Sequence, residues 1–329
     1  MPEVIRMKGQ IALGATFAAP LAVAGAWFVF AAGGGDGKPS AVLLPPEPGI
    51  GQVVAASSAT PATSATPLSA CSGPSVDADF LASNQILSYY GNPHVPGMGI
   101  LGELEPDELV ARVKEHAATY DELNGARGVQ PAFHIVYASA QPEAGRDGLH
   151  LQFLDKRTIL RYLDLACKNG FLVFLDIQVG RSDVETEMRD ILPYLAAPNV
   201  HAALDPEFAM GPGEVPGEAI GSLDAADVNA AQAVLEEFVE RRGLTDKMLI
   251  VHQFTDGMIT NRALIDDYPR VRLVVDMDGV GPAEIKGVKF GWYAAPAEYS
   301  GIKLFFRQDP DLMGERDVLG LDPDVIIYQ

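Results

Sequence analysis

Short apolar runs alternate with segments of helical pattern throughout residues 79–329, and this alternation constrains the fold more than any other feature of the chain. It predicts parallel strands joined by helices, because parallel neighbours need a long crossover connection. The candidate strands are 86–91, 132–138, 171–180, 200–208, 248–254, 271–279, 301–308 and 324–329. Eight β/α units in about 250 residues favour an α/β fold, the (β/α)8 TIM-type barrel, over an open doubly wound sheet. The last strand ends the chain, so we expect a barrel truncated after its eighth strand.

Local signals mark where several of the connecting helices begin and end. Pro106 falls in the first turn of one helix, Asp155 begins a second, and the run Ser182–Glu185 forms a capping-box pattern for a third. Gly170 and Gly243 fall where helices are capped at their C-termini.

The N-terminal part of the chain predicts a membrane segment. Residues Ile11–Ala32 carry no charge and are long enough to cross a hydrocarbon core of about 30 Å. Arg6 and Lys8 precede this stretch, so the positive-inside rule places the body outside the cytoplasm. We expect residues 1–35 to be an uncleaved transmembrane anchor; the alternative is a cleaved signal peptide and a secreted protein.

The segment that follows has the composition of a tether. Residues 36–78 are rich in Pro, Ala, Ser and Thr and contain few large apolar side chains. Such a segment buries too little surface to fold, so we expect it to be disordered. The predicted organisation is therefore an anchor in residues 1–35, a linker in 36–78 and one barrel domain in 79–329.

Charge and cysteine content exclude two classes of protein. The chain has 24 Lys and Arg against 44 Asp and Glu, a formal net charge of −20, and no basic run that would bind nucleic acid. Its two cysteines, Cys71 and Cys167, exclude a disulfide scaffold and every CxxC metal motif, but leave one bridge between them open.

Polar side chains gather at the carboxyl ends of the predicted strands, which is where TIM barrels carry their chemistry. They are Asp176, Gln178, Asp205, Glu207, His252, Gln253, Asp276, Asp278, Gln308 and Tyr328, with Tyr90 at the end of the first strand. Carboxylates that converge on one cavity cost free energy, so their density predicts a functional site there.

The fourth strand shows this pattern most clearly. With a side-chain period of two, His201, Ala203, Asp205 and Glu207 share one face, while apolar residues such as Leu204 occupy the other. We therefore expect Asp205 and Glu207 to point into the barrel mouth. Two carboxyl groups, one protonated and one ionised, are typical of glycoside hydrolases.

The run Asp205–Glu207 (DPE) resembles the terminal D-x-E motif of family 18 glycoside hydrolases, the chitinases and their relatives. Met277 and Asp278 resemble part of the motif on the sixth strand of that family. The resemblance implies that Glu207 is the general acid, that Asp205 orients an N-acetyl group of the sugar, and that Asp278 holds the reacting acetamide.

The resemblance to family 18 is partial. Val200 and Ala203 stand where the full motif has Asp, and the Tyr of the sixth strand is missing. The chain is also similar to secreted bacterial barrel proteins of unassigned activity through the runs Tyr89–Pro93, Leu204–Phe208 and Val251–Phe254. This second resemblance supports the barrel and the export, and implies no activity.

The leading hypothesis is an exported, membrane-tethered, glycoside-hydrolase-like protein that acts on a carbohydrate of the cell envelope or its surroundings. In it Glu207 is the general acid, and Asp205, Asp176 and Asp278 are supporting carboxylates. The residues expected to contact the substrate are Tyr90, Gln178, His252, Gln253, Asp276, Gln308 and Tyr328.

Two alternatives stay open. One is a non-catalytic barrel that binds a glycan or an envelope component, which predicts fully hydrogen-bonded rim acids and no raised pKa. The other is a phosphodiesterase of the phosphatidylinositol-lipase type, in which His94 and His134 would both point into the mouth as acid and base.

No cofactor is expected from the motifs of the chain. The G-x-S-x-G nucleophile elbow, the phosphate-binding loop and the dinucleotide fingerprint are all missing from the sequence. A divalent cation stays open, because oxygen ligands of the kind that Ca²⁺ or Mg²⁺ prefers are offered by Asp176, Asp205, Glu207 and Asp276.

Overall fold

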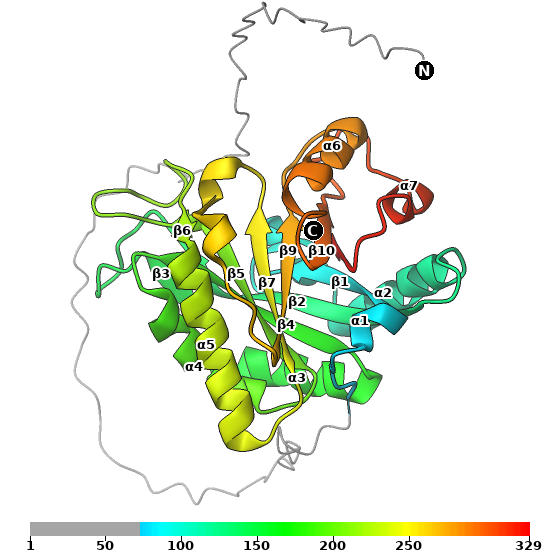
Figure 1. The fold of residues 1–329 in the computed structure, drawn as a ribbon, viewed down its shortest axis with the longest axis horizontal. Coiled ribbons are helices and arrows are strands. Elements are labelled where there is room, and N and C mark those ends of the chain that lie inside the picture. The colour runs from blue at the N-terminus through cyan, green and yellow to red at the C-terminus, as the bar shows by residue number, and fades with distance from the viewer. Residues whose placement is uncertain (1–72) are drawn as a thin grey trace, which may run out of the picture. The chain divides into compact units, whose positions relative to one another are not determined.

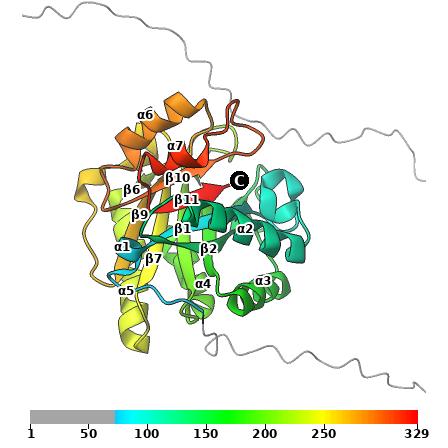
Figure 2. The same ribbon diagram turned by 90° about the vertical axis from the view of Figure 1, so that its right-hand side faces the viewer.

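The computed structural model describes residues 73–329, and these form a closed (β/α)8 barrel (Figures 1 and 2). The parallel strands of its wall are β1 (Asn84–Gly91), β2 (Gly128–Ala140), β4 (Leu172–Gly180), β5 (Val200–Ala209), β7 (Lys247–Gln253), β9 (Val271–Met277), β10 (Tyr299–Leu304) and β11 (Val325–Tyr328). The wall closes because β1 pairs with both β2 and β11. The predicted TIM-type fold is confirmed, and each wall strand overlaps one of the runs expected from the sequence.

Most of the helices lie outside this wall. The helices are α1 (Phe80–Ser83), α2 (Pro106–Asp121), α3 (Lys156–Asn169), α4 (Val184–Leu195), α5 (Ala225–Arg242), α6 (Ala283–Tyr293) and α7 (Glu315–Leu319). The smaller elements are β3 (Leu151–Phe153), which pairs antiparallel with β2, the pair β6 (Leu223–Asp224) and β8 (Ile259–Thr260), and the 3₁₀ turns η2 (Pro96–Met98), η3 (Ile100–Gly102), η4 (Asp256–Met258) and η5 (Arg262–Leu264).

Capping residues define the ends of the longer helices. The Asp155 carboxylate accepts a 3.0 Å hydrogen bond from a backbone N–H in the first turn of α3. Asp224 and Asp227 form a capping box at the start of α5. Gly170 and Gly243 follow α3 and α5 in the left-handed region, with φ of 68° and 62°. The caps predicted at Asp155, Gly170 and Gly243 are confirmed.

Side chains alternate along the strands between two apolar cores. Those that fill the inside of the barrel include Ile86, Ala132, Phe174, Ala203 and Ile250. Those that pack outward against the helices include Leu87, Phe133, Leu175, Leu204 and Leu249. Because Ala203 faces inward and Leu204 outward, the period of two directs Asp205 and Glu207 into the barrel, as the sequence predicts.

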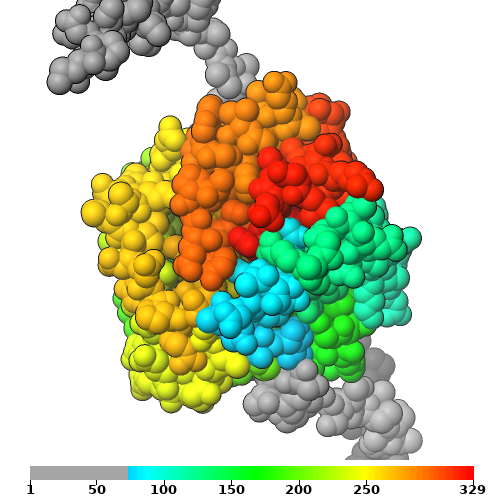
Figure 3. All heavy atoms as spheres, turned by 45° about the vertical axis from the view of Figure 1, so that its right-hand side comes forward, coloured from blue at the N-terminus to red at the C-terminus, as the bar shows by residue number. Residues whose placement is uncertain are grey.

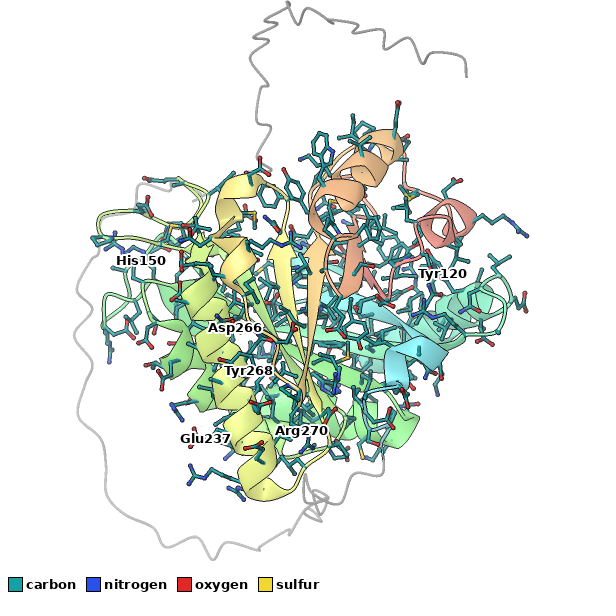
Figure 4. The ribbon with its side chains drawn as sticks, viewed as in Figure 1. Tyr120, His150, Glu237, Asp266, Tyr268 and Arg270 are labelled. Carbon is teal, nitrogen blue, oxygen red and sulfur yellow. The ribbon has the colours of Figure 1, made fainter. Side chains whose placement is uncertain are left out.

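The wall beside the last strand is covered by α2. Tyr328 of β11 points outward, and its hydroxyl lies 2.8 Å from that of Tyr120 on α2 (Figure 4). Phe306, just after β10, stacks on the Tyr328 ring with 4.9 Å between ring centroids. Figure 3 shows the red C-terminal segment bordering the cyan and green segments of the first β/α unit. Helix α2, which comes much earlier in the chain, thus covers β11. Within the described residues no helix follows β11.

Within residues 73–329, no helix combines the length and the apolar character needed to span a bilayer. For this part of the chain, that finding overturns the predicted membrane-anchored localisation. The predicted anchor Ile11–Ala32 lies outside the described residues, as does most of the predicted linker. Cys71 also lies outside them, whereas Cys167 of α3 is disulfide-bonded.

One buried lysine connects the amino-terminal ends of β5 and β7. Lys247, at the start of β7, is fully buried, and its ammonium group donates to the carbonyl oxygens of Ala197 at 2.7 Å and Val200 at 3.0 Å. Lys247→Met keeps the aliphatic chain but leaves both carbonyls without this donor. We expect the free energy of unfolding to fall by about 1–3 kcal/mol, measured by urea unfolding with circular dichroism.

A matched control for this variant is Lys168→Met. Lys168 is an exposed residue of α3 whose ammonium group pairs with Asp164 on the same helix. We expect this substitution to change the stability by no more than about 0.5 kcal/mol. Equal stability of the Lys247→Met variant and the unmodified protein would show that the two buried carbonyls do not depend on this lysine.

Candidate functional site

Ionisable side chains line the inside of the barrel at the carboxyl ends of its strands. This barrel cluster consists of Tyr90, His134, Asp176, Asp205, Glu207, His252, Asp276, Asp278 and Lys303. All of them are buried except Glu207, which is half-buried and is the most exposed member. The structure therefore brings together most of the site residues predicted from the sequence, and adds Lys303 together with His134, which only the phosphodiesterase alternative had named.

His252 of β7 connects carboxylates from two other strands. Its Nδ1 lies 2.9 Å from Oδ2 of Asp276 and 3.4 Å from Oδ2 of Asp278. Its Nε2 lies 3.5 Å from Oδ2 of Asp176, on β4. His134 of β2 approaches the same Asp176 oxygen from another side, with its Nε2 at 3.6 Å. The two imidazoles thus converge on one carboxylate.

His134 is a neutral imidazole in this environment. Its side chain has no exposed surface, and burial lowers the pKa of His134 to about 4, more than the nearby Asp176 carboxylate raises it. Its ring lies 4.9 Å from that of Tyr90 and 5.3 Å from that of His252, measured between centroids. His134 is therefore an inward-facing residue of the barrel cluster.

Lys303 of β10 places an ammonium group among the carboxylates. Its Nζ lies 3.4 Å from Oδ2 of Asp278 and 3.6 Å from the centroid of the Tyr90 ring. Burial lowers the pKa of Lys303, but the charges of Asp278 and Asp205 outweigh that effect and raise it above its usual value. Sequence reasoning missed this residue, although its apolar neighbours Ile302 and Leu304 face the helices and leave Lys303 the inner face.

Another buried lysine, besides Lys247 and Lys303, holds the backbone around this ammonium group in place. Lys286 of α6 donates hydrogen bonds to the carbonyl oxygens of Gly279 and Lys303, both at 2.7 Å. Its Nζ also lies 3.0 Å from Oδ2 of Asp309. Because Gly279 directly follows Asp278, this lysine ties together the two strand ends that carry Asp278 and Lys303.

Asp205 and Glu207 form the acidic pair that the sequence predicts on one face of β5. Burial, aided by the charge of Asp278, raises the pKa of Asp205 to about 7. Burial, aided by the charge of Asp205, raises the pKa of Glu207 to about 8. A carboxylate oxygen of Asp205 also accepts a 3.1 Å hydrogen bond from the backbone N–H of Glu207. At neutral pH the pair therefore retains a proton that exposed carboxyl groups would have lost.

Two of the three predicted glutamine contacts, Gln178 and Gln253, are engaged with the protein itself. The Gln178 side-chain oxygen accepts a 2.8 Å hydrogen bond from Ala140 N. The Gln253 oxygen accepts one of 2.8 Å from the Arg262 guanidinium, and its amide donates to Thr255 O at 3.2 Å. Gln178 thus holds the end of β2, and Gln253 holds the loop that follows β7.

Two other predicted contact residues lie away from the barrel cluster. Tyr328 faces the helices rather than the mouth, because it follows the inward-facing Ile327 on a strand whose side chains alternate. Its hydroxyl meets that of Tyr120. Gln308 is half-buried in the turn after β10, beyond the end of the strand. For Tyr328, the prediction assigned the wrong face of the strand.

The phosphodiesterase alternative fails on the position of one histidine. The imidazole of His94 lies outside the barrel at the start of α3, where Nε2 is 3.1 Å from Asp155 and 2.9 Å from Thr158 Oγ1. Its side chain is 57% exposed, whereas His134 is fully buried inside the barrel. The two imidazoles cannot act as acid and base on one substrate.

Two sets of side chains in residues 73–329 could hold a metal ion. In each set the candidate ligand atoms lie within 4.8 Å of one another: His134, Asp176 and His252 form one set, and His252, Asp276 and Asp278 the other. The sequence suggested a set of oxygen ligands from Asp176, Asp205, Glu207 and Asp276, and this set is neither of the two. Each of the two sets contains at least one histidine.

No family model matches the chain, and no curated protein matches its sequence. Among solved structures, the chain is similar to an oxaloacetate acetylhydrolase in complex with the product oxalate, at 13% identity and a TM-score of 0.36, over 64% of this chain and 71% of that one. It is similar to a second oxaloacetate acetylhydrolase structure at 8% identity and a TM-score of 0.32, over 74% and 68%. A third, in complex with the inhibitor 3,3-difluorooxalacetate, gives 8% and 0.30, over 75% and 74%. A likeness at this level assigns the chain to no family.

The prediction that the chain is a glycoside hydrolase is wrong. No family model matches, and the solved structures named above are oxaloacetate acetylhydrolases rather than glycoside hydrolases. The physical reason is visible at Asp278, whose carboxylate lies 3.4 Å from both the Lys303 ammonium and His252 Nδ1 rather than free to hold an acetamide. The glycan-binding alternative fails as well, since Asp176 and Asp276 keep buried oxygens without a hydrogen bond and the pKa of Glu207 is raised.

The raised pKa of Glu207 predicts a stability that depends on pH. Between the usual glutamate value and about 8, the folded chain holds a proton that the unfolded chain has lost. The free energy of unfolding should therefore fall as pH rises through this range, by up to about 1.4 kcal/mol per pH unit. Glu207→Gln should flatten this slope in urea unfolding between about pH 5 and about pH 8, with EDTA present so that no bound cation adds charge.

The matched control is Glu218→Gln, at an exposed position in the loop after β5. This variant should keep the slope of the unmodified protein. If Glu207→Gln keeps it too, Glu207 is ionised in the folded protein and the pH effect has another source.

Proposed function

We propose that the chain is a hydrolase that cleaves an uncharged carbonyl compound, such as a carboxylic ester, at the barrel mouth. One observation carries this proposal: buried carboxyl groups and one ammonium group meet at the carboxyl ends of β5, β9 and β10. Active sites of TIM barrels lie at this end. Placing so many ionisable groups in a closed interior costs stability, which is typical of a functional site.

Lys303 supplies a fixed positive charge for an oxyanion. Its ammonium group is already desolvated and is oriented by Asp278 at 3.4 Å and by the Tyr90 ring at 3.6 Å. Such a preorganised cation stabilises the negative charge that develops on a carbonyl oxygen when water attacks the carbon.

Asp205 and Glu207 are suited to act as base and acid. Like charges on neighbouring carboxyl groups separate their proton affinities, so one is ionised while the other is protonated. Asp205 takes a proton from a water molecule while the oxygen of that water bonds to the carbonyl carbon, and the carbonyl oxygen becomes an oxyanion beside Lys303. The tetrahedral intermediate then breaks its bond to the leaving oxygen, which takes the proton of Glu207, the more exposed of the two.

Charge and motif content support an uncharged substrate and a water nucleophile. Carboxylates outnumber the cations in the barrel cluster, so an anionic substrate would be repelled. The chain has no G-x-S-x-G elbow to supply a serine nucleophile. Direct attack by water is therefore the route that the available groups support.

The test is the hydrolysis of a panel of neutral nitrophenyl esters and lactones by the full chain, beside anionic esters of the same alcohols. We expect turnover of neutral substrates, lowered about 10²-fold or more in Glu207→Gln and about 10²- to 10³-fold in Lys303→Met. Glu218→Gln, at an exposed loop position, is the matched control and should keep full activity. Failure to cleave any neutral member, or full activity in both site variants, would contradict the proposed hydrolase.

A further inference from the structure

We propose that His134, Asp176 and His252 bind a divalent transition metal, zinc being the ion that their donor atoms fit best. The three side chains come from β2, β4 and β7 and are fully buried. This inference goes beyond the proposed hydrolysis and does not depend on it, since it concerns a binding site that can be measured without substrate.

The spacing of the donor atoms matches metal ligation. Oδ2 of Asp176 lies 3.6 Å from Nε2 of His134 and 3.5 Å from Nε2 of His252. Ligands held at about 2.1 Å from a tetrahedral zinc are roughly 3.4 Å apart, which follows from the tetrahedral angle. The separations are at the same time too long for good hydrogen bonds.

None of these atoms forms a hydrogen bond of normal length. Both ring nitrogens of His134, both carboxylate oxygens of Asp176 and Nε2 of His252 are buried and make no hydrogen bond within the described residues. A buried polar atom without a partner costs about 1–3 kcal/mol, and a protein rarely tolerates several together. One cation between the three side chains satisfies an atom on each of them.

Asp276 orients one of the imidazoles toward this point. Its Oδ2 lies 2.9 Å from Nδ1 of His252, so with a metal bound it would accept the Nδ1 proton and leave the lone pair of Nε2 to the ion. A carboxylate behind a histidine ligand is the usual outer partner of metal sites. We assign Asp276 this positioning role.

The charge of the barrel cluster calls for a cation. Five carboxyl groups, those of Asp176, Asp205, Glu207, Asp276 and Asp278, share the barrel interior with the single lysine Lys303, and the one proton held by the Asp205–Glu207 pair still leaves the carboxylates in excess. A divalent ion offsets two of the negative charges that a closed interior cannot leave to water. Two imidazoles and one carboxylate favour zinc or a neighbouring first-row metal over Ca²⁺ or Mg²⁺, and three protein ligands leave a coordination position for water.

The test measures metal content directly. The untagged full chain is unfolded with EDTA in the absence of reductant, refolded with or without Zn²⁺ and dialysed, and bound zinc is counted by mass spectrometry. We expect about one zinc per chain after refolding with zinc. Competition with a chromophoric chelator should then show affinity lowered more than 100-fold in Asp176→Asn and His134→Gln, and about 10- to 100-fold in Asp276→Asn.

His201→Gln is the matched control. His201 is another fully buried histidine inside the barrel, but its Nδ1 accepts a 3.2 Å hydrogen bond from Met248 N, at the amino-terminal end of β7. This variant should keep the zinc content of the unmodified protein. Unaltered zinc affinity in Asp176→Asn and His134→Gln would place the metal elsewhere and overturn the proposal.

Variants that fail to fold would still leave a decisive measurement on the unmodified chain. X-ray absorption of the zinc-loaded protein should show two imidazoles and one carboxylate around the ion. A first shell without two imidazoles, or a refolded chain that retains no zinc after dialysis, would overturn the site, and neither result bears on ester hydrolysis.

Discussion

Closure of the barrel is the constraint on which the rest of the structure depends. Because β1 pairs with both β2 and β11, every wall strand has two neighbours and most inward side chains are removed from water. Apolar side chains are stabilised by removal from water, but buried ionisable side chains need a hydrogen-bond partner or an opposite charge. The contacts of His252 with Asp176 and Asp276, and of Lys303 with Asp278, follow from that requirement.

The interior is divided between stability and function. Ile86, Ala132, Leu172 and Met248 form part of an apolar core inside the barrel, and further inward residues come from other strands. The carboxyl ends of the same strands carry charged groups that repel one another and leave several oxygens and nitrogens without hydrogen bonds. The free energy lost there is offset by the apolar burial along the rest of each strand, a division typical of functional sites.

Pattern reasoning recovered the fold because it depends on local features. Period-two alternation identified the inner face of β5, and Asp155, Gly170 and Gly243 identified helix ends. The same reasoning assigned Tyr328 to the site, because a polar residue at a strand end gives no sign of its face unless the neighbouring residues are used. Lys303 was missed for a related reason: an isolated lysine resembles a surface residue until the burial of Ile302 and Leu304 on the helix side is considered.

The sequence by itself determined the barrel, the order of its strands along the chain and the presence of acidic residues at their carboxyl ends, because these follow from local periodicity and capping. Only the tertiary structure decided which of those residues meet. The approach of His134 and His252 to Asp176 joins strands that are far apart in the chain, and it depends on register and barrel closure. Local patterns carry no information on such distances, and it is these distances on which the proposed metal binding and carbonyl hydrolysis are argued, in place of the sugar cleavage that the residue types alone suggested.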